Sequence, residues 1–194
     1  MAMPAPPPIV PDTSRRDWTV EERNALPDDG NRYEVVDGEL LVTPAPTWRH
    51  QNAALELAVT LKAYAERHGL QCMIAPADVT FSPRRVVEPD VFVVPTVQGR
   101  PPSRFEDVGR LVLAVEILSP STARADHHVK RRVYQSEGIP ENWIVDAANR
   151  YIERWRPGEE IPETLTDSIA WQPVREADPL VIDLAAFFCR VHGE

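Results

Sequence analysis

Cysteine is scarce in this chain: Cys72 and Cys189 are the only two among 194 residues, and they stand far apart. They match no metal-ligand or redox spacing, so neither a disulfide framework nor a cysteine zinc site is indicated. A reducing, cytoplasmic location is the simpler expectation. Long apolar runs are also lacking, because none approaches the roughly 20 residues that a membrane-spanning helix needs. A membrane role is therefore not expected.

Positive charge is in short supply as well. Lysine and arginine number 21 against 30 acidic residues, which gives a formal net charge of −9. A protein that coats nucleic acid by bulk electrostatics needs a field of cations, so any contact with nucleic acid must be local. Clustered carboxylates that bind cations would reconcile such a contact with the acidic balance, because bound metal reverses the local field.

The length fits one domain with a continuous core. The proline-rich segment 1–16 lacks an apolar centre, so it is expected to be a flexible arm rather than a signal peptide, with a single domain over residues 17–194. The composition, 43% apolar and 26% charged, is that of a globular protein.

Local patterns predict a mixed α/β or α+β architecture. The strongest signal is Asp37-Gly38 between two β-prone runs, which predicts a hairpin. Apolar residues at three- and four-residue steps predict a helix over 47–68, and a nearly continuous apolar run at 111–118 predicts a central strand covered on both faces. The other expected elements are helices at 19–26 and 121–138 and strands at 32–36, 39–43, 70–74, 78–82, 86–94, 142–146 and 151–155. The strands at 70–94 are expected to be consecutive in one sheet. The pattern of residues 157–194 predicts secondary structure less clearly.

Glu116 is the most informative residue because it interrupts the apolar run LVLAVEIL. An unpaired buried carboxylate is very costly, so it must be paired, protonated or bound to metal. A structural ion pair is the plain alternative to a functional site.

Asp90 raises the same question inside VVEPDVFVV. The preceding Pro89 removes a ladder donor and suggests an edge or a bulge, and a cap at such a turn is the plain alternative. If the strands of Asp90 and Glu116 are neighbours, both acids can face one cavity. Their hard oxygen atoms would suit Mg²⁺ or Mn²⁺.

Further candidates are weaker. Lys130 lies in the helix after Glu116, where it could fold back toward that acid, but the run Lys130, Arg131, Arg132 is usually a solvated helix face. Glu34 could add a third acid, although a strand glutamate is usually exposed. His50 at the start of the long helix is more often a surface residue than a ligand.

Taken in order, these residues resemble the Uma2 family, whose members are described as putative restriction endonucleases. The resemblance rests on GNRYEVVDGEL (30–40), PTWRHQ (46–51), VVEPDVFVV (86–94), LAVEILSPST (113–122) and KRRVYQSEGIPENWIVD (130–146), and covers about residues 18–155.

The resemblance implies a restriction-endonuclease-like fold, a mixed sheet of about four core strands between helices, with metal-dependent phosphodiester cleavage. Asp90 would be the Asp of the PD motif and Glu116 the second acid. Leu118 occupies the usual lysine position, and the lysine would be displaced to Lys130. Glu34 and His50 match the family's N-terminal acid and helix-opening histidine. Mg²⁺ or Mn²⁺ would be the cofactor and DNA the expected partner.

Within that mechanism Arg131 and Arg132 are candidates for contacts to backbone phosphates, which position a substrate without reading its sequence. Two rival functions stay open. The chain could be an inactive nuclease fold that binds without cutting, since fold does not fix function. It could also be an interaction module, such as a homodimer anchored by exposed tryptophans, with Trp143, Trp155 and Trp171 as candidates, although core packing would explain them equally well.

Overall fold

The computed structural model describes residues 10–105, 108–120 and 122–194, and within them the main sheet has six strands in the order β10-β9-β8-β7-β6-β3. The strands are β3 (Leu70–Ile74), β6 (Val91–Pro95), β7 (Leu113–Ile117), β8 (Glu141–Asp146), β9 (Tyr151–Trp155) and β10 (Glu163–Leu165). β7 and β8 are parallel and the other neighbours antiparallel, so the sheet is mixed as expected.

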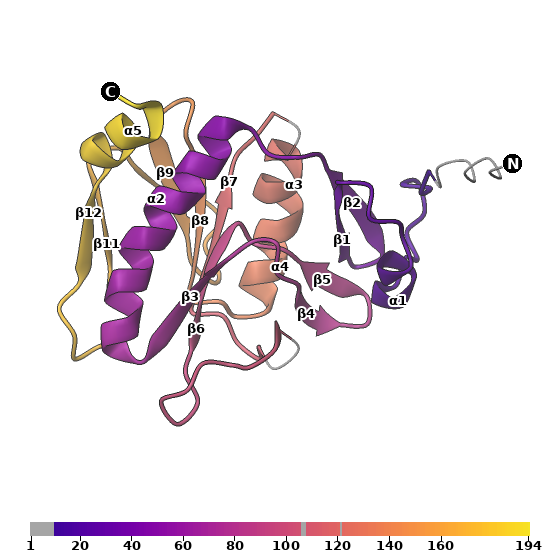
Figure 1. The fold of residues 1–194 in the computed structure, drawn as a ribbon, viewed down its shortest axis with the longest axis horizontal. Coiled ribbons are helices and arrows are strands. Elements are labelled where there is room, and N and C mark those ends of the chain that lie inside the picture. Colours follow the sequence, from indigo (N-terminus) through magenta and orange to yellow (C-terminus); the bar gives the residue numbers. More distant parts are fainter. Residues whose placement is uncertain (1–9, 106–107, 121) are drawn as a thin grey trace, which may run out of the picture.

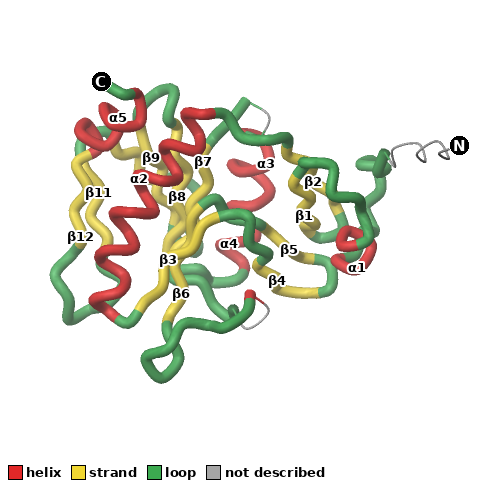
Figure 2. The backbone as a smooth tube through the Cα atoms, in the orientation of Figure 1, coloured by secondary structure: helices red, strands yellow, loops and turns green. Residues whose placement is uncertain are grey.

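Helices cover both faces of this sheet (Figures 1 and 2). The long helix α2 (Trp48–Ala65), continued by the 3₁₀ turn η1 (Glu66–His68), lies on one face with α5 (Leu184–His192). On the other face lies the crossover between β7 and β8, formed by α3 (Ala123–Ala125), the π-helical turn η3 (Asp126–Lys130) and α4 (Arg131–Ser136).

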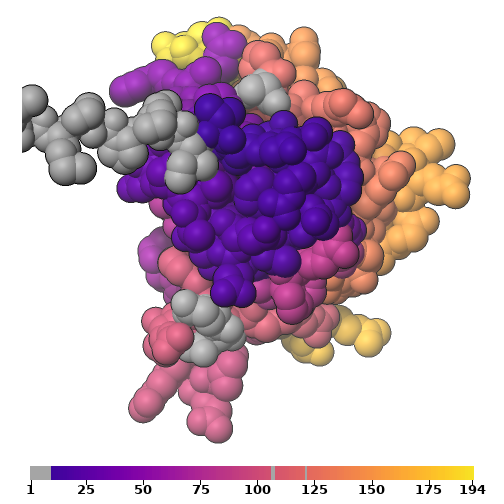
Figure 3. All heavy atoms as spheres, turned by 90° about the vertical axis from the view of Figure 1, so that its right-hand side faces the viewer, coloured from indigo at the N-terminus to yellow at the C-terminus, as the bar shows by residue number. Residues whose placement is uncertain are grey.

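Outside that crossover helix lies a second sheet, in the order β2-β1-β5-β4. Its strands are β1 (Arg32–Val36), β2 (Glu39–Thr43), β4 (Val79–Ser82) and β5 (Arg85–Val87), with the short helix α1 (Val20–Asn24) beside them. The crossover helix is therefore enclosed between two sheets (Figure 1). Buried apolar side chains from both sheets meet on it around Tyr134. Figure 3 shows the N-terminal part of this layer as one continuous indigo patch.

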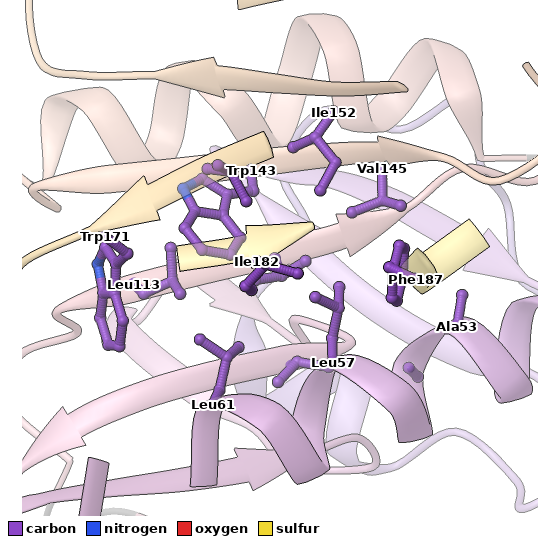
Figure 4. Packing of buried hydrophobic residues seen from close by; sticks show 14 of the residues in the cluster. Ala53, Leu57, Leu61, Leu113, Trp143, Val145, Ile152, Trp171, Ile182 and Phe187 are labelled. Carbon is purple, nitrogen blue, oxygen red and sulfur yellow. The ribbon is translucent and has the colours of Figure 1, made fainter. Parts of the chain in front are cut away.

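The central strand is β7, as its apolar run predicts. Leu113, Val115 and Ile117 enter the core under α2, while Ala114 faces the crossover helix. Figure 4 shows Leu57 and Leu61 of α2 directed toward the sheet in the first of these layers. Because side chains alternate along a strand, Glu116 must share the face of Ala114.

The hairpin is confirmed residue by residue. β1 and β2 pair antiparallel from Arg32 opposite Thr43 to Val36 opposite Glu39. Its turn needs positive φ at both positions, and Asp37 (52°) and Gly38 (89°) adopt it. The helix expected at 19–26 is present as α1, and a capping box starts it, with Thr19 and Glu22 bonded reciprocally.

The strand expected at 86–94 is wrong. The chain forms β5 up to Val87 and β6 from Val91, and the two belong to different sheets, so the strands between 70 and 94 do not form one sheet. Pro89 explains the break, because it offers no N–H to a ladder at the point where the chain crosses between sheets. Asp90 consequently stands just before β6 rather than within a strand.

The C-terminal part, which the sequence left undefined, adds β10, the antiparallel pair β11 (Ser168–Trp171) and β12 (Leu180–Asp183), and α5. Trp171, Trp143 and Trp155 are all buried, with exposed fractions of 7% or less. The idea that these three anchor an interface is therefore wrong, and core packing accounts for them.

The N-terminal segment 1–16 was expected to be a flexible arm. Its residues 1–9 lie outside the described residues. From residue 10 onward the arm contacts the body of the protein, because the Trp18 indole donates to the Asp12 carbonyl and Arg84 donates to that of Arg16. Among the described helices, none has both the length and the apolarity to cross a bilayer.

Candidate functional site

Lys130 is the centre of a buried charge cluster. Its ammonium lies 3.0 Å from Glu34 Oε2, 3.1 Å from Glu116 Oε2 and 3.5 Å from Asp126 Oδ1. The three acids come from β1, β7 and the π-helical turn, and all four side chains are at most 2% exposed. One lysine thus links both sheets to the helix between them.

The local backbone explains why Lys130 points inward. It ends the π-helical turn η3, a wider turn that interrupts the crossover helix and that is often found at functional sites. Asp126 lies four residues earlier on the same face. Tyr134, four residues later, donates its hydroxyl to Glu116 Oε1 in a short hydrogen bond. Glu116 therefore receives a cation on one oxygen and a phenol on the other.

Asp90 stands beside Glu116, just before the adjacent strand β6. Phe92 of β6 pairs with Ala114 of β7, and continuing that antiparallel register places Asp90 opposite Glu116 on the same face of the sheet. The Ile117 amide donates to Asp90 Oδ2 at 2.8 Å, which fixes the carboxylate against β7. The two acids singled out from the sequence therefore meet.

Two further side chains complete the surroundings of Asp90. His50 Nε2, from the first turn of α2, lies 3.0 Å from Asp90 Oδ2, and Arg32 of β1 donates to Oδ1 at 2.9 Å. Asp90 is thus held by two basic groups and one backbone amide.

Electrostatics separate the acids into two groups. Burial alone would raise the pKa of Asp90, but the His50 hydrogen bond and the Arg32 charge lower that pKa to about 2. Burial raises the pKa of Glu116 well above its ordinary range despite Lys130, and also raises the pKa of Asp126. Burial lowers the pKa of Lys130, but the surrounding carboxylates outweigh this effect and raise that pKa well above its ordinary value. Lys130 therefore carries its positive charge at neutral pH.

A series of hydrogen bonds and ion pairs connects this cluster to the N-terminal layer. Glu34 Oε1 accepts from the Glu88 amide at 2.7 Å, and the Glu88 carboxylate is bonded to Arg23, which also pairs with Asp78. Burial, together with Glu34 and Asp78, raises the pKa of Glu88 to about 7. Glu88 borders a cavity of about 400 Å³ that also contains Arg23 and Asp78.

Solvent reaches the cluster from the side of Asp90. A cavity of about 410 Å³ is lined by Asp90, Arg32 and His50, together with residues of α2 and the segment 74–76. A second cavity of about 600 Å³ shares His50 with it and extends past the ends of β7 and β8. A substrate would thus meet Asp90 first, and Glu116 and Lys130 behind it.

The sequence model of the Uma2 family, described as "Putative restriction endonuclease", matches residues 20–179. The chain belongs to the Uma2 family. Among solved structures, the fold is similar to a protein from Anabaena variabilis ATCC 29413 described as a putative nuclease belonging to DUF820. The two share 19% identity, the TM-score is 0.70, and the match covers 90% of this chain and 99% of the other. No curated protein matches the sequence.

Within this Uma2 chain, the structure brings together Asp90, Glu116, Lys130, Glu34 and His50. Three of them differ from the plainer interpretation of the sequence: Lys130, Glu34 and His50 are buried rather than on the surface. They are buried because the second sheet encloses this region, and no local sequence pattern predicts that sheet.

Arg131 and Arg132 lie on α4 outside the cluster. The Arg131 guanidinium stacks on Trp155 at 4.2 Å from the ring centre and donates to the His127 carbonyl and to Gln135, whereas Arg132 is exposed. Arg131 thus has a packing role, and the phosphate contacts of both stay a prediction.

Four site residues were missed by sequence reasoning: Arg32, Asp126, Tyr134 and Glu88. Asp126 and Tyr134 carried a readable signal, because they lie four residues on either side of Lys130 and so share its helix face. Arg32 sits two residues before Glu34 on the same face of β1.

Mg²⁺ or Mn²⁺, which the family resemblance implies, fits the donor set. Four buried carboxyl groups, those of Glu34, Asp90, Glu116 and Asp126, face the two permanent cations Arg32 and Lys130. Glu34 Oε2 and Asp126 Oδ1 face the Lys130 ammonium at 3.0 and 3.5 Å and accept no other hydrogen bond from the described residues.

The protein's share of such a metal site would be small. No three His, Cys, Asp or Glu side chains of the described residues converge on one ion position. The protein would therefore supply the carboxylates of Asp90 and Glu116, with water completing the shell, as is common for Mg²⁺. The ion would compete with Arg32 for Asp90.

Proposed function

We propose that this Uma2 chain is a metal-dependent endonuclease that hydrolyses phosphodiester bonds, with DNA as the expected substrate. One observation carries the proposal: Asp90 and Glu116 meet on one face of the sheet, beside a buried Lys130, in a chain whose family is described as putative restriction endonucleases. Burying this many acids is costly, and such sites are commonly functional.

Asp90 and Glu116 would hold Mg²⁺ or Mn²⁺. When bound, the ion lowers the pKa of a water molecule and neutralises charge developing on the scissile phosphate. His50 and the Ile117 amide keep Asp90 oriented, while Tyr134 and Lys130 orient Glu116. The low pKa of Asp90 keeps it an anionic ligand at neutral pH.

Lys130 replaces the missing lysine at position 118. Leu118 offers no charge, whereas the Lys130 ammonium lies 3.1 Å from Glu116. The cluster keeps this ammonium charged, so it can stabilise a pentacoordinate phosphate or orient the attacking water. The crossover helix thus supplies, through Lys130, the positive charge that position 118 lacks.

The test incubates the protein with plasmid, single-stranded DNA, branched DNA and RNA in the presence of Mg²⁺ or Mn²⁺. Asp90→Asn and Glu116→Gln keep the side-chain shapes and are each expected to lose at least about a hundredfold in rate, because removing electrostatic stabilisation of the transition state has costs of that order. Lys62→Met, at an exposed ion pair on α2, is the matched control and should cut normally. Cleavage that survives both acid substitutions indicates a contaminant and refutes the proposal.

One observation favours a second candidate, a nuclease fold that binds nucleic acid without cutting it. Asp90 already has Arg32 and His50 as partners, so its charge is balanced without an ion. This alternative predicts that Mg²⁺ and Mn²⁺ leave the midpoint of thermal unfolding unchanged, because only a ligand of the native state raises it.

A homodimer is the assembly expected for an enzyme that cuts both strands. It stays a prediction, which sedimentation velocity can check. Because Trp143, Trp155 and Trp171 are in the core, the dimer would need another surface.

A further inference from the structure

The largest exposed aromatic surface of the described residues is Trp48. Its side chain is 88% exposed, whereas the four other tryptophans, at 18, 143, 155 and 171, are at most 7% exposed. Leaving a side chain that can bury 150–250 Å² in water is unfavourable unless a ligand covers it. Trp48 is the first residue of α2, a helix of 18 residues.

Trp48 borders the cavity of about 600 Å³ described above, which we call the Trp48 cavity. Its walls come from the first turn of α2, the loop after β7, the turn after β8 and the end of α5. The lining side chains that bear on its chemistry are Trp48, Arg49, His50, Asn52, Ser119 and His192. Among the described residues no Asp or Glu lines it, although the chain carries nine more acidic than basic residues. In charge, the cavity is complementary to an anion rather than to a cation.

The Trp48 cavity is continuous with the candidate nuclease site through one residue. His50 lines both this cavity and the one that reaches Asp90, and its Nε2 lies 3.0 Å from Asp90. The other ring nitrogen, Nδ1, is buried and has no hydrogen-bond partner among the described residues. A buried polar atom without a partner is costly, and here it belongs to a side chain that faces both cavities.

The first turn of α2 adds a second attraction for anions. The leading backbone N–H groups of a helix have no acceptor within it, and together with the helix dipole they favour phosphate. Exposed Arg49 lies in the same turn. The His50 amide is already capped by the Thr47 hydroxyl, which leaves the amides of Trp48 and Arg49 as the leading donors of this turn. An aromatic face and a positive charge are the elements by which proteins bind unpaired nucleotides.

We propose that the Trp48 cavity binds one unpaired nucleotide of the substrate strand, with its base stacked on Trp48 and its phosphate near Arg49 and the start of α2. The inference rests on the proposed nuclease function and names its substrate class: a strand that is single-stranded, or opened next to the scissile bond. A continuous duplex keeps its bases stacked inside and offers none to Trp48.

The test measures binding without cleavage, in a metal chelator. Because Trp48 is the exposed tryptophan, quenching of the protein's fluorescence reports stacking on it. A single strand of about 12 nucleotides, within the range of known single-strand sites, should quench the emission, and the corresponding blunt duplex should not. For the variants, which lack this reporter, the anisotropy of a labelled strand gives the affinity, and Trp48→Ala should weaken single-strand binding roughly tenfold to a hundredfold, as expected for loss of base stacking. Trp48→Phe should retain most of the affinity.

Val59→Ala is the matched control, because Val59 is a solvent-exposed apolar residue of the same helix that does not line the cavity. Equal affinity of wild type and Trp48→Ala, or equal loss for duplex and single strand, overturns the inference. Quenching by single strands in a protein that cuts nothing with Mg²⁺ or Mn²⁺ would refute the proposed function while supporting this binding site. Cleavage of blunt duplex that is unaffected by Trp48→Ala would do the reverse.

Discussion

The structure of the charge cluster predicts a large loss of folding stability when Lys130 is replaced with methionine. Methionine keeps the unbranched shape and removes the ammonium from three carboxyl groups at 3.0, 3.1 and 3.5 Å. Removing one partner of a buried ion pair costs about 3–5 kcal/mol, because the charges left behind stay buried. For a chain of this length, each kcal/mol lowers the unfolding midpoint by about 2–4 °C, so a loss of roughly 6–20 °C is expected.

The cost should depend on pH in a defined direction. The folded pKa of Lys130 is raised above 10.5, so the contribution of the ammonium is present at all pH values below that. In the variant, Glu116 and Asp126 lose the charge that lowers their pKa, and they stay protonated to higher pH. The variant therefore loses stability relative to wild type as the pH rises through the raised pKa values of these acids in the folded wild type, because there the wild type ionises them beside Lys130 and the variant does not. The deficit should be larger at pH 8 than at pH 5.

Urea unfolding at both pH values, followed by the fluorescence of the buried tryptophans, provides the measurement. Lys62→Met is the control, because the ion pair of Lys62 with Glu66 is exposed and solvent screens it, so its loss should leave the free energy of unfolding nearly unchanged. Adding Glu116→Gln to Lys130→Met should recover part of the loss at pH 8, since glutamine does not have to take up a proton on folding as the buried glutamate does. A loss below about 1 kcal/mol, or one that is equal at pH 5 and pH 8, would refute the description of the cluster.

Three further predictions concern other parts of the molecule. Arg32→Gln removes the cation that competes for Asp90 and should tighten Mn²⁺ binding roughly tenfold, about 1.4 kcal/mol, in isothermal titration calorimetry; unchanged or weaker binding would contradict the competition. Burial raises the pKa of the Cys72 thiol to about 12, so at pH 8 a thiol reagent should modify Cys189 and spare Cys72 in the folded protein, and rapid modification of both would show that this part of the core opens. Gly38→Ala should destabilise the hairpin by about 1–3 kcal/mol in thermal unfolding, because Gly38 has φ of 89° and a β-carbon there would collide with the Arg16 carbonyl; an alanine variant as stable as wild type would contradict this.

The parts of the fold that could be predicted are those set by neighbouring residues. The hairpin follows from the backbone preference of Asp37 and Gly38, and the helix α2 from its apolar period. β7 follows from an apolar run that only a strand covered on both faces can bury. Each signal lies within a few residues of the element it predicts, so no knowledge of distant contacts was needed.

The second sheet could not be predicted, because it depends on long-range pairing. β5 joins β1, about 50 residues earlier, by only two paired positions, Val35 with Val86 and Val36 with Arg85. Two apolar runs lie close together across 86–94, so the pattern alone merges two strands that belong to different sheets. The local sign of the break is the interruption by Glu88, Pro89 and Asp90.

The site was predictable to the same extent. Glu116 and Asp90 stand out because an acid in an apolar run needs a compensating partner. Their partners come from other elements. Arg32 and Glu34 lie in the second sheet. Lys130 lies in a π-helical turn, which the sequence pattern does not distinguish from an ordinary helix. Their burial follows from packing between layers, which the sequence expresses only through contacts distant along the chain.

The central claim is that Asp90 and Glu116 together bind a divalent cation. The most direct measurement follows thermal unfolding of the wild type, Asp90→Asn and Glu116→Gln during titration with Mn²⁺. The midpoint of the wild type should rise with Mn²⁺ concentration, because the ion binds the native state, and neither variant should respond. A wild-type midpoint that does not move, or an equal rise in all three proteins, would contradict the claim.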